Sequence, residues 1–235
     1  MSHERIVVFN SLLEKLFRSR HAPKIVEIGA ADGADTVKLL EMACQFSSSG
    51  RCKFFAFEPD PRNLDRFAKR KELSEVVLVP KAVSDQDGEA TFYLSSGRNP
   101  NWEGDWSLSN SLMRPTGHYN RYPWVQFPEE VTVPTIMLDT FFYEKIPIAF
   151  PIDFIWCDIN GAERQMIRGG WQTLQRTRYL YTEFGEGLFE NQASLWDIAQ
   201  LLPGWKPIFT MDNDVLLENQ NHIKGQGGPW HSISA

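Results

Sequence analysis

An acidic residue followed by a run of small residues is the most chemically distinctive stretch of this chain. Glu27 lies within the otherwise apolar segment 24–28, and residues 29–33 read Gly-Ala-Ala-Asp-Gly. Small residues between a strand and a helix let a ligand approach the backbone, and the positive end of the helix dipole points into the same turn. A buried carboxylate is costly without a partner, so Glu27 requires a donor-rich group such as a ligand amine or backbone amides. These features predict a ligand-binding turn.

Two classes of ligand use a strand, a glycine-containing turn and a helix. A dinucleotide site has the pattern G-x-G-x-x-G, which places a pyrophosphate on the helix N-terminus. Here the pattern is E-x-G-x-x-x-G, with Asp32 inside the turn. Two carboxylates repel a pyrophosphate, whereas they attract the ammonium and sulfonium groups of S-adenosylmethionine. The charge therefore favours the methyl donor; the alternatives are an ordinary tight turn or a nicotinamide-dependent dehydrogenase.

A second acid, Glu58, follows the apolar segment 53–57 and precedes Pro59. An acid at the end of the second strand is placed to accept hydrogen bonds from the two hydroxyls of a ribose. Ala82 and Val83, at the end of the apolar segment 76–83, offer adenine an apolar wall and backbone hydrogen bonds. Together these residues predict an adenosine site at one edge of a sheet.

Residues from about 95 to 130 show no helical or strand period. A loop of this length inside a compact domain is usually functional or disordered, and its aromatic content argues against disorder. Aromatic faces pack against the C–H faces of sugar rings, so this insertion is predicted to be a lid over a carbohydrate-like substrate. The alternative is a lid that packs only on its own core. The candidate substrate-binding residues are Trp102, Trp106, His118 and Trp124.

The remaining segments alternate between strands and helices, which predicts an α/β, Rossmann-like fold with a doubly wound, mostly parallel seven-stranded sheet. An amphipathic helix over about residues 4–20, within an N-terminal region of about 1–22, precedes the first strand. Asp139 is expected to cap a short helix of its own. The last two strands are separated only by a tight turn, so they form an antiparallel hairpin, as in class I methyltransferases. The sheet strands are expected at 24–28, 53–59, 76–83, 152–159, 178–184, 206–211 and 215–218, with further strands at 90–94 and 131–138.

Methyl transfer to an oxygen requires a group that removes the acceptor proton. Asp158, near the end of the segment 152–159, lies where a base or a metal ligand belongs, although it also suits a supporting hydrogen-bonding role. His118 is the rival base, because an imidazole titrates near neutral pH. Asp158, Glu163 and Glu183 supply the oxygen ligands that a divalent cation such as Mg²⁺ prefers, so a metal site is a further possibility.

Composition limits the classes of partner. The 235 residues carry a formal net charge of −6, which argues against a protein that depends on nucleic-acid phosphate contacts. No window approaches the apolar length of a membrane span, and the N-terminus lacks a signal-peptide pattern. The three cysteines fit neither a disulfide framework nor a zinc spacing. We therefore expect a cytoplasmic protein, a single domain over residues 1–235, with a small-molecule or glycan substrate and no nucleic-acid or membrane partner.

Five segments of the chain resemble the FkbM-type methyltransferases: 26–33, 56–61, 81–85, 135–139 and, most specifically, 155–163, which reads Ile-Trp-Cys-Asp-Ile-Asn-Gly-Ala-Glu. The family's usual form of the last segment is K-I/M-D-V/I-E-G-A/Y-E. Asp158 and Glu163 match it, whereas Trp156 stands at or beside the lysine position and Asn160 replaces the first glutamate. A family role that needs a negative charge at position 160 is therefore not implied.

The resemblance implies S-adenosylmethionine-dependent O-methylation, often of sugars. The alternative of a different class is a non-catalytic binding protein that retains the fold and engages a partner through the aromatic insertion. The expected catalytic residues are Asp158 and His118. The expected cofactor-binding residues are Glu27, Gly29, Ala30, Ala31, Asp32, Gly33, Glu58, Pro59, Ala82, Val83 and Asp158.

Overall fold

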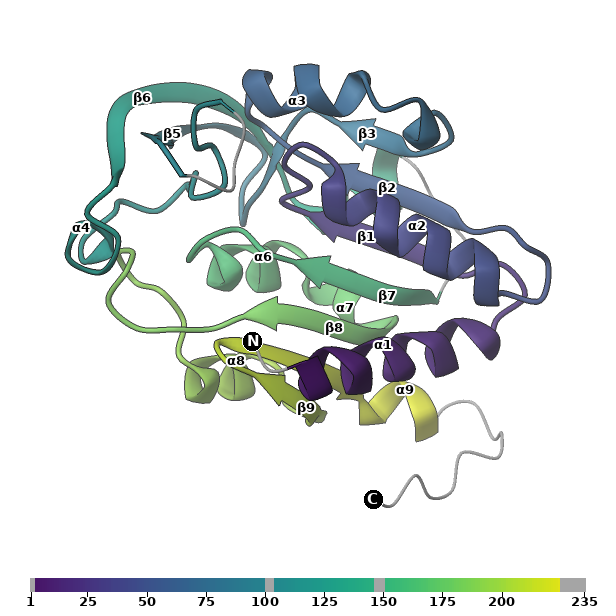
Figure 1. Ribbon diagram of the computed structural model, residues 1–235. Helices are drawn as coiled ribbons and strands as arrows, with labels where there is room; N and C mark the ends of the chain where they lie inside the picture. The colour runs from purple at the N-terminus through teal and green to yellow at the C-terminus, as the bar shows by residue number, and fades with distance from the viewer. Residues whose placement is uncertain (1–2, 100–103, 146–150, 225–235) are drawn as a thin grey trace.

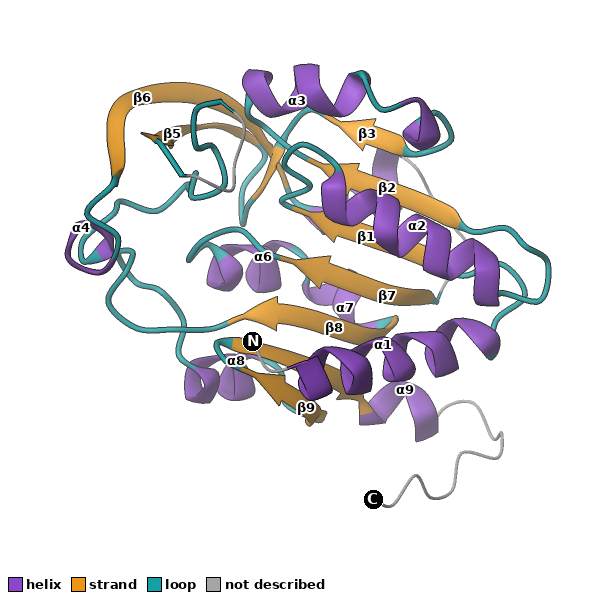
Figure 2. Ribbon diagram, in the orientation of Figure 1, coloured by secondary structure: helices purple, strands orange, loops and turns teal. Residues whose placement is uncertain are grey.

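A seven-stranded sheet between two layers of helices forms the centre of the computed structural model, which describes residues 3–99, 104–145 and 151–224 (Figures 1 and 2). The strand order is β3-β2-β1-β7-β8-β10-β9. Neighbours from β3 to β8 are parallel, and β10 is antiparallel to both β8 and β9, which confirms the predicted sheet and hairpin. The strands are β1 (Lys24–Ile28), β2 (Lys53–Phe57), β3 (Val77–Val79), β7 (Ile152–Cys157), β8 (Thr177–Glu183), β9 (Trp205–Met211) and β10 (Asp214–Asn219).

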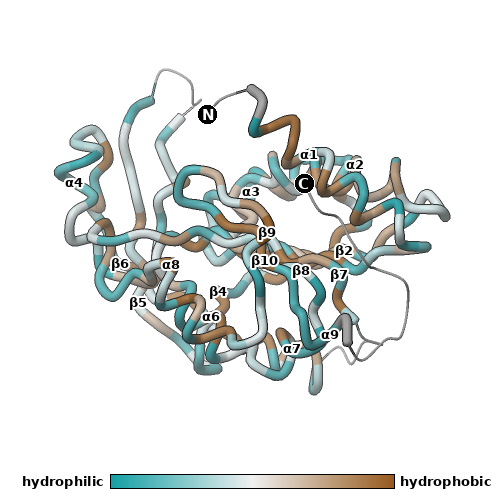
Figure 3. The backbone as a smooth tube through the Cα atoms, turned by 90° about the horizontal axis from the view of Figure 1, so that it is seen from below, coloured by the Kyte–Doolittle hydropathy of each residue, from teal (hydrophilic) through white to brown (hydrophobic). Residues whose placement is uncertain are grey.

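The alternation of side chains along the strands produces one apolar core on each face of this sheet. In β1, Ile25 belongs to the core beneath the first helices, whereas Val26 and Ile28 belong to the opposite core. Figure 3 shows hydrophobic segments concentrated along the central strands. The helices over the first core are α1 (His3–Arg18), α2 (Ala34–Phe46), α3 (Pro61–Ala68) and the 3₁₀ turn η1 (Lys71–Leu73). Those over the second are α5 (Leu138–Thr140), the π-helical turn η2 (Phe141–Lys145), α6 (Glu163–Gly169), α7 (Trp171–Gln175) and α8 (Leu195–Leu201).

A separate three-stranded sheet stands beside the carboxyl ends of the parallel strands (Figure 1). Its order is β4-β6-β5, and its strands are β4 (Ala82–Val83), β5 (Gly88–Gly97) and β6 (Val125–Ile136). Between β5 and β6 the chain forms the short helix α4 (His118–Arg121), and the described chain ends in α9 (Gln220–Lys224). None of the helices in the described ranges is both long and apolar enough to cross a bilayer.

Two predictions about strands were wrong in detail. The predicted strand 76–83 is two strands in different sheets, because Pro80 lacks the N–H that would continue the ladder. The insertion is shorter than 95–130, because β5 extends to Gly97 and β6 begins at Val125. The first half of β6 contains Pro128 and two exposed acids, so it lacks the alternating apolar pattern on which strand prediction depends.

Asp139 does not cap its own helix. It lies inside α5, whose N-cap position is Met137. Its carboxylate instead accepts hydrogen bonds from the backbone N–H of Gln172 at 2.9 Å and of Thr173 at 2.7 Å, and from the Thr173 hydroxyl at 2.7 Å. Asp139 therefore caps α7, where the preceding Gly170 offers no side-chain cap. The residue performs the predicted chemistry on a helix that is distant in sequence.

We predict that Asp139→Ala lowers the free energy of unfolding by about 1–2 kcal/mol, because two N–H groups at the start of α7 lose their acceptor. Urea unfolding followed by circular dichroism measures this change. Asp65→Ala is the matched control, since Asp65 forms an exposed pair with Lys69 and its loss costs about 0.5 kcal/mol or less. Equal destabilisation by the two variants would contradict the capping role.

Candidate active site

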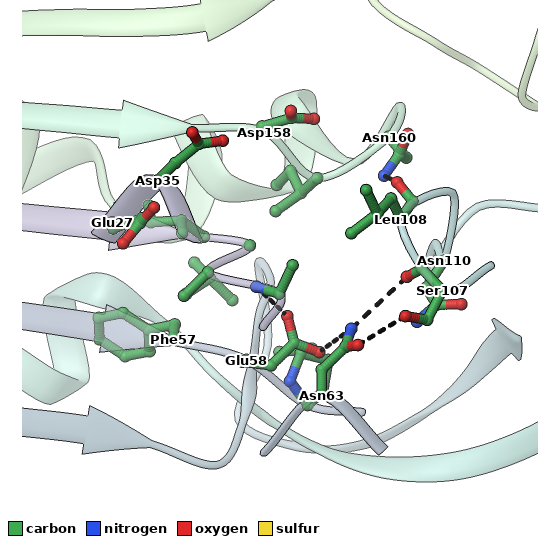
Figure 4. Close-up of a pocket in the computed structure, with 18 of the residues that line it drawn as sticks. Glu27, Asp35, Phe57, Glu58, Asn63, Ser107, Leu108, Asn110, Asp158 and Asn160 are labelled. Carbon is green, nitrogen blue, oxygen red and sulfur yellow. Dashed lines mark hydrogen bonds between the residues drawn. The ribbon is translucent and has the colours of Figure 1, made fainter. Parts of the chain in front are cut away.

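A cavity of about 320 Å³ opens at the carboxyl ends of β1, β2 and β7. The turn after β1, the beginning of α2 and the residues after β2 form one side. The loop after β7 and part of the insertion form the other, and β4 and β5 close the end (Figure 4). The predicted cofactor residues Glu27, Glu58, Ala82, Val83 and Asp158 all line this cavity. The structure therefore brings together acids that are widely separated in sequence.

The turn after β1 holds the strand ends unusually close to one another. Gly29 has a φ of +88°, and a Cβ at this position would lie 1.9 Å from the backbone oxygen of Asp158, so only glycine fits. The N–H groups of Gly29 and Ala30 both donate to the Phe57 oxygen at 3.0 Å, and the Asp158 N–H donates to the Ile28 oxygen at 3.0 Å. These contacts fix β1, β2 and β7 relative to one another at the cavity.

Glu27 is a buried carboxyl group with one side-chain partner. Its side chain accepts a hydrogen bond from the Thr36 hydroxyl at 2.5 Å. Burial raises the pKa of Glu27 to about 8 against the effect of that hydrogen bond, and the nearby Asp35, Asp158 and Glu58 add to the rise. Glu27 thus lines the cavity in an environment that favours either a bound proton or a cationic ligand.

Glu58 is also buried, but it accepts more hydrogen bonds than Glu27 does. It accepts hydrogen bonds from the N–H of Ala31 at 2.9 Å and of Asp60 at 2.7 Å, and from the Asn63 amide at 3.4 Å. Ala31 adopts a φ of +47°, which turns its N–H toward Glu58. Burial raises the pKa of Glu58 to about 7, and these donors oppose the rise. The carboxylate is therefore held in one orientation at the cavity wall.

Asp158 lies at the end of a row of acids that crosses three strands. Its side chain is accessible from the cavity, and Glu183, the last residue of β8, is one position beyond Thr182, which pairs with Cys157. Asp214 pairs directly with Glu183 across β8 and β10. Removal from bulk solvent, with Asp214 and Asp35, raises the pKa of Asp158 to about 7. Burial, Asp158 and Glu163 raise the pKa of Glu183 in the same way.

The predicted metal ligands do not form a metal centre in the part of the chain that the structure describes. There, no three histidine, cysteine, aspartate or glutamate side chains are arranged to hold an ion. Glu163 is fully buried below the loop after β7, and its carboxylate accepts the Gly161 N–H at 3.3 Å. Asp158 lines the cavity, whereas Glu163 and Glu183 are not among the described residues that line it.

Asp32 lies at the cavity but is already paired. Its carboxylate forms an ion pair with Arg70 and accepts the Ala34 N–H at 3.1 Å, and the Arg70 Nε donates to the Asp32 backbone oxygen at 2.5 Å. Arg70 lies just before η1, so it fastens the turn after β1 to the segment after α3. Arg70 therefore offsets the charge of Asp32, which leaves Glu27 as the carboxyl group of this region that is open to a cationic ligand.

The described aromatic residues that were expected to bind substrate do not line this cavity. Trp106 and Trp124 stack edge to face with their ring centroids 5.0 Å apart, and neither is among the described lining residues. His118 is buried among Tyr122, Phe127 and Phe189, which lowers its pKa through loss of solvent, and it is also absent from that lining. Trp102 lies outside the described residues.

Short polar residues and apolar side chains line the insertion side of the cavity instead. They are Ser107, Leu108, Asn110 and Leu112, and Asn63 and Phe92 join them from α3 and β5. Sequence reasoning missed all six, because the four insertion residues lie in an irregular segment with no periodic signal, and Phe92 is indistinguishable from an ordinary strand residue. The available signal was position: four of the residues lie in the insertion, and Asn63 follows a predicted strand end.

The strand order, the terminal hairpin and the binding turn after β1 define a class I, S-adenosylmethionine-dependent methyltransferase. The Methyltransferase FkbM domain model matches residues 27–209, so the chain belongs to the FkbM methyltransferase family.

The chain is also 36% identical over 226 residues to the 2-O-methyltransferase NoeI of Sinorhizobium fredii (strain NBRC 101917 / NGR234), covering 92% of this chain and 84% of that protein. Among solved structures it is similar to an rRNA methylase from Streptococcus thermophilus, with 13% identity, a TM-score of 0.49 and coverage of 93% and 98%. It is also similar to a SAM-dependent methyltransferase from Aquifex aeolicus, with 12% identity, a TM-score of 0.44 and coverage of 89% of each chain.

We predict that Glu27→Gln stabilises the protein at alkaline pH. Because the pKa of Glu27 is raised from 4.5 to about 8 in the folded state, its contribution to stability falls as pH rises between these values. The variant lacks this loss, so its unfolding free energy relative to wild type should rise by on the order of 2–4 kcal/mol between pH 5 and pH 9, at ~1.4 kcal/mol per pKa unit. Urea titrations across this range measure it. Parallel stability curves for the two proteins would contradict the burial argument.

Proposed function

We propose that this methyltransferase transfers a methyl group from S-adenosylmethionine to a hydroxyl of a carbohydrate or glycosylated small molecule, in the cytoplasm. The observation that carries the proposal is the cavity in which Glu27, Glu58 and Asp158 converge on a turn of small residues. The likeness to a 2-O-methyltransferase over nearly the whole chain supports oxygen as the methylated atom. The free cysteines are compatible with the proposed location.

The donor side of the cavity suits the polar groups of S-adenosylmethionine. Glu27, buried with a single hydroxyl partner, would bind the methionine ammonium, which offsets the cost of its burial. Glu58, fixed by backbone donors, would accept the ribose hydroxyls. Ala82 and Val83 would provide the apolar wall for adenine. Gly29, Ala30 and Ala31 line the cavity, so the turn would leave room for the ligand; Gly33 is not among the described lining residues.

Asp158 is the group that we assign to proton removal. When bound, S-adenosylmethionine supplies an electrophilic methyl carbon, and the acceptor oxygen must be held about 3 Å from that carbon. Asp158 is accessible in the cavity, and a pKa of about 7 matches a base that operates near neutral pH. His118 remains the rival, although its burial among aromatic rings separates it from solvent.

The acceptor side combines the apolar residues Phe92, Leu108 and Leu112 with short polar ones. Leu108 would contact the C–H face of a sugar, and Ser107 and Asn110 offer hydrogen-bonding groups to its hydroxyls. Trp124 is 38% exposed and is supported by Trp106, so this pair would serve as an outer platform for a longer glycan. Trp102 stays a substrate-binding candidate from the sequence alone, since it lies outside the described residues.

We predict that S-adenosylhomocysteine binds the purified protein and that Glu58→Gln weakens this binding roughly 10- to 100-fold, because a charge-assisted hydrogen bond is lost. Isothermal titration calorimetry measures the affinity, with Asp65→Asn as a surface control. An NADH titration tests the dehydrogenase alternative, and a magnesium arm tests the metal ligands expected from the sequence. Absence of binding to folded protein would overturn the donor assignment.

We predict that Asp158→Asn lowers kcat by roughly 10²- to 10⁴-fold, because the acceptor proton loses its base. Transfer of radiolabelled methyl from S-adenosylmethionine to a panel of glycosides measures activity, and resistance of the product to mild alkali distinguishes an ether from an ester. In wild type, kcat/KM should rise as pH increases through about 7, where Asp158 loses its proton. His118→Gln should retain activity. Loss of activity in His118→Gln, with activity retained in Asp158→Asn, would instead identify His118 as the base.

A further inference from the structure

A short part of the insertion, residues 107–111, spans the cavity and is here called the strap. Ser107, Leu108 and Asn110 face the cavity from the side opposite Glu27 (Figure 4). Two of its N–H groups are bonded back to β5, that of Ser109 to the Ser95 hydroxyl and that of Ser111 to the Tyr93 oxygen, both at 3.2 Å. The strap is therefore an ordered wall, and its position depends on the hydrogen bonds that it forms on each side of the cavity.

One side of the strap is fastened to the donor half of the cavity. The Ser107 hydroxyl donates to the Asn63 side-chain oxygen at 2.7 Å, and the Asn110 amide donates to the buried Asp60 carboxylate at 2.6 Å. The amide of the same Asn63 donates to Glu58 at 3.4 Å. The strap is thus connected through one side chain to the acid that we assign to the ribose.

The other side is fastened by Asn160 alone among the described residues of the loop after β7. Its amide donates to the Leu108 oxygen at 3.2 Å, and its backbone oxygen accepts the Ser111 hydroxyl at 2.7 Å. Its φ of +52° lies in the left-handed region, which asparagine adopts more readily than most residues. A carboxylate here would present an acceptor to the Leu108 carbonyl, so the contact requires an amide donor.

We propose that Asn160 is a positioning residue that fixes the strap as the acceptor-side wall of the cavity, an inference that rests on the proposed function. Asn160 follows Asp158 by two positions in the same loop, so it sets the strap in register with the residue that removes the proton. A misplacement of about 1 Å costs roughly 10²-fold in rate when the acceptor must approach the methyl carbon. The asparagine that stands at position 160 in place of the family's usual glutamate thereby has a function that depends on its amide.

Two substitutions distinguish the effect of the Asn160 amide donor from the effect of the backbone conformation at this position. Asn160→Asp keeps the shape and the tolerance of positive φ but replaces the donor by an acceptor. Asn160→Gly removes the side chain and relieves any strain at positive φ. Asn191→Asp is the matched control, because Asn191 also has a positive φ, of +55°, and an exposed side chain.

Hydrogen–deuterium exchange of the full-length protein, followed by mass spectrometry, measures the strap directly. We expect peptides that cover residues 107–113 to exchange roughly 3- to 10-fold faster in Asn160→Asp and Asn160→Gly, as the loss of one hydrogen bond predicts. Asn191→Asp should leave them unchanged. Calorimetric affinity for S-adenosylhomocysteine should stay within about twofold of wild type, whereas methyl transfer to the best glycoside should fall by about tenfold or more.

Unchanged exchange of residues 107–113 in Asn160→Asp would overturn the proposal, as would a parallel loss of S-adenosylhomocysteine affinity, which would make Asn160 a donor-binding residue. If Asn160→Asp exchanges faster throughout the chain, the variant is destabilised as a whole. The exchange of residues 107–113 and the S-adenosylhomocysteine affinity of Asn160→Gly then test the proposal by the same criteria. Failure of wild type to bind S-adenosylhomocysteine would instead refute the proposed function, and the exchange data would still show whether Asn160 holds the strap.

Discussion

The close contact between the ends of β1 and β7 is the constraint on which the rest of the site depends. The Ile28 oxygen accepts the Asp158 N–H at 3.0 Å, and the adjacent Gly29 leaves no room for a Cβ beside the Asp158 oxygen. This contact brings the turn after β1 to the loop after β7, which carries Asp158 and Asn160. Because the Gly29 N–H also reaches Phe57, the end of β2 joins the same point, and Glu58 follows there.

Convergence of acids at this point opposes stability in the unliganded protein. Burial raises the pKa values of Glu27 and Glu58 to the neutral range. Loss of bulk water and repulsion from Asp214 and Asp35 do the same for Asp158, which remains accessible from the cavity. Folding thus holds carboxyl groups where their charged forms are disfavoured. The rest of the sheet supplies the compensation, through apolar cores on both faces. A cationic and hydroxyl-rich ligand relieves the same electrostatic cost, which is why a binding site can retain residues that a purely structural core would exclude.

Much of this arrangement could be predicted from the sequence, because it depends on local patterns. The segment around Glu27 combines a β-branched apolar run, a turn of small residues and a carboxylate inside the apolar run. Each of these features predicts a specific local structure or a ligand. The pairing of Ala82 and Val83 with β6, the helix capped by Asp139 and the cavity-lining role of Asn63 depend on partners far along the chain. The aromatic residues of the insertion are ambiguous for a related reason: large rings are as suited to packing on one another, as Trp106 and Trp124 do, as to binding a sugar.

The same distinction explains how this site can vary without losing its fold. The contacts that fix the strand ends are made mostly by backbone atoms, which any sequence with glycine at position 29 supplies. The insertion is fixed by side chains, through Asn63 and Asp60 on one side and Asn160 on the other. Substitutions at these few positions would move the wall opposite the donor while leaving the sheet intact. Asn160 contacts the strap and forms no hydrogen bond with Glu58 in the described part of the chain, so changes there would alter the acceptor side with little effect on donor binding, whereas Asn63 links the two halves through Glu58.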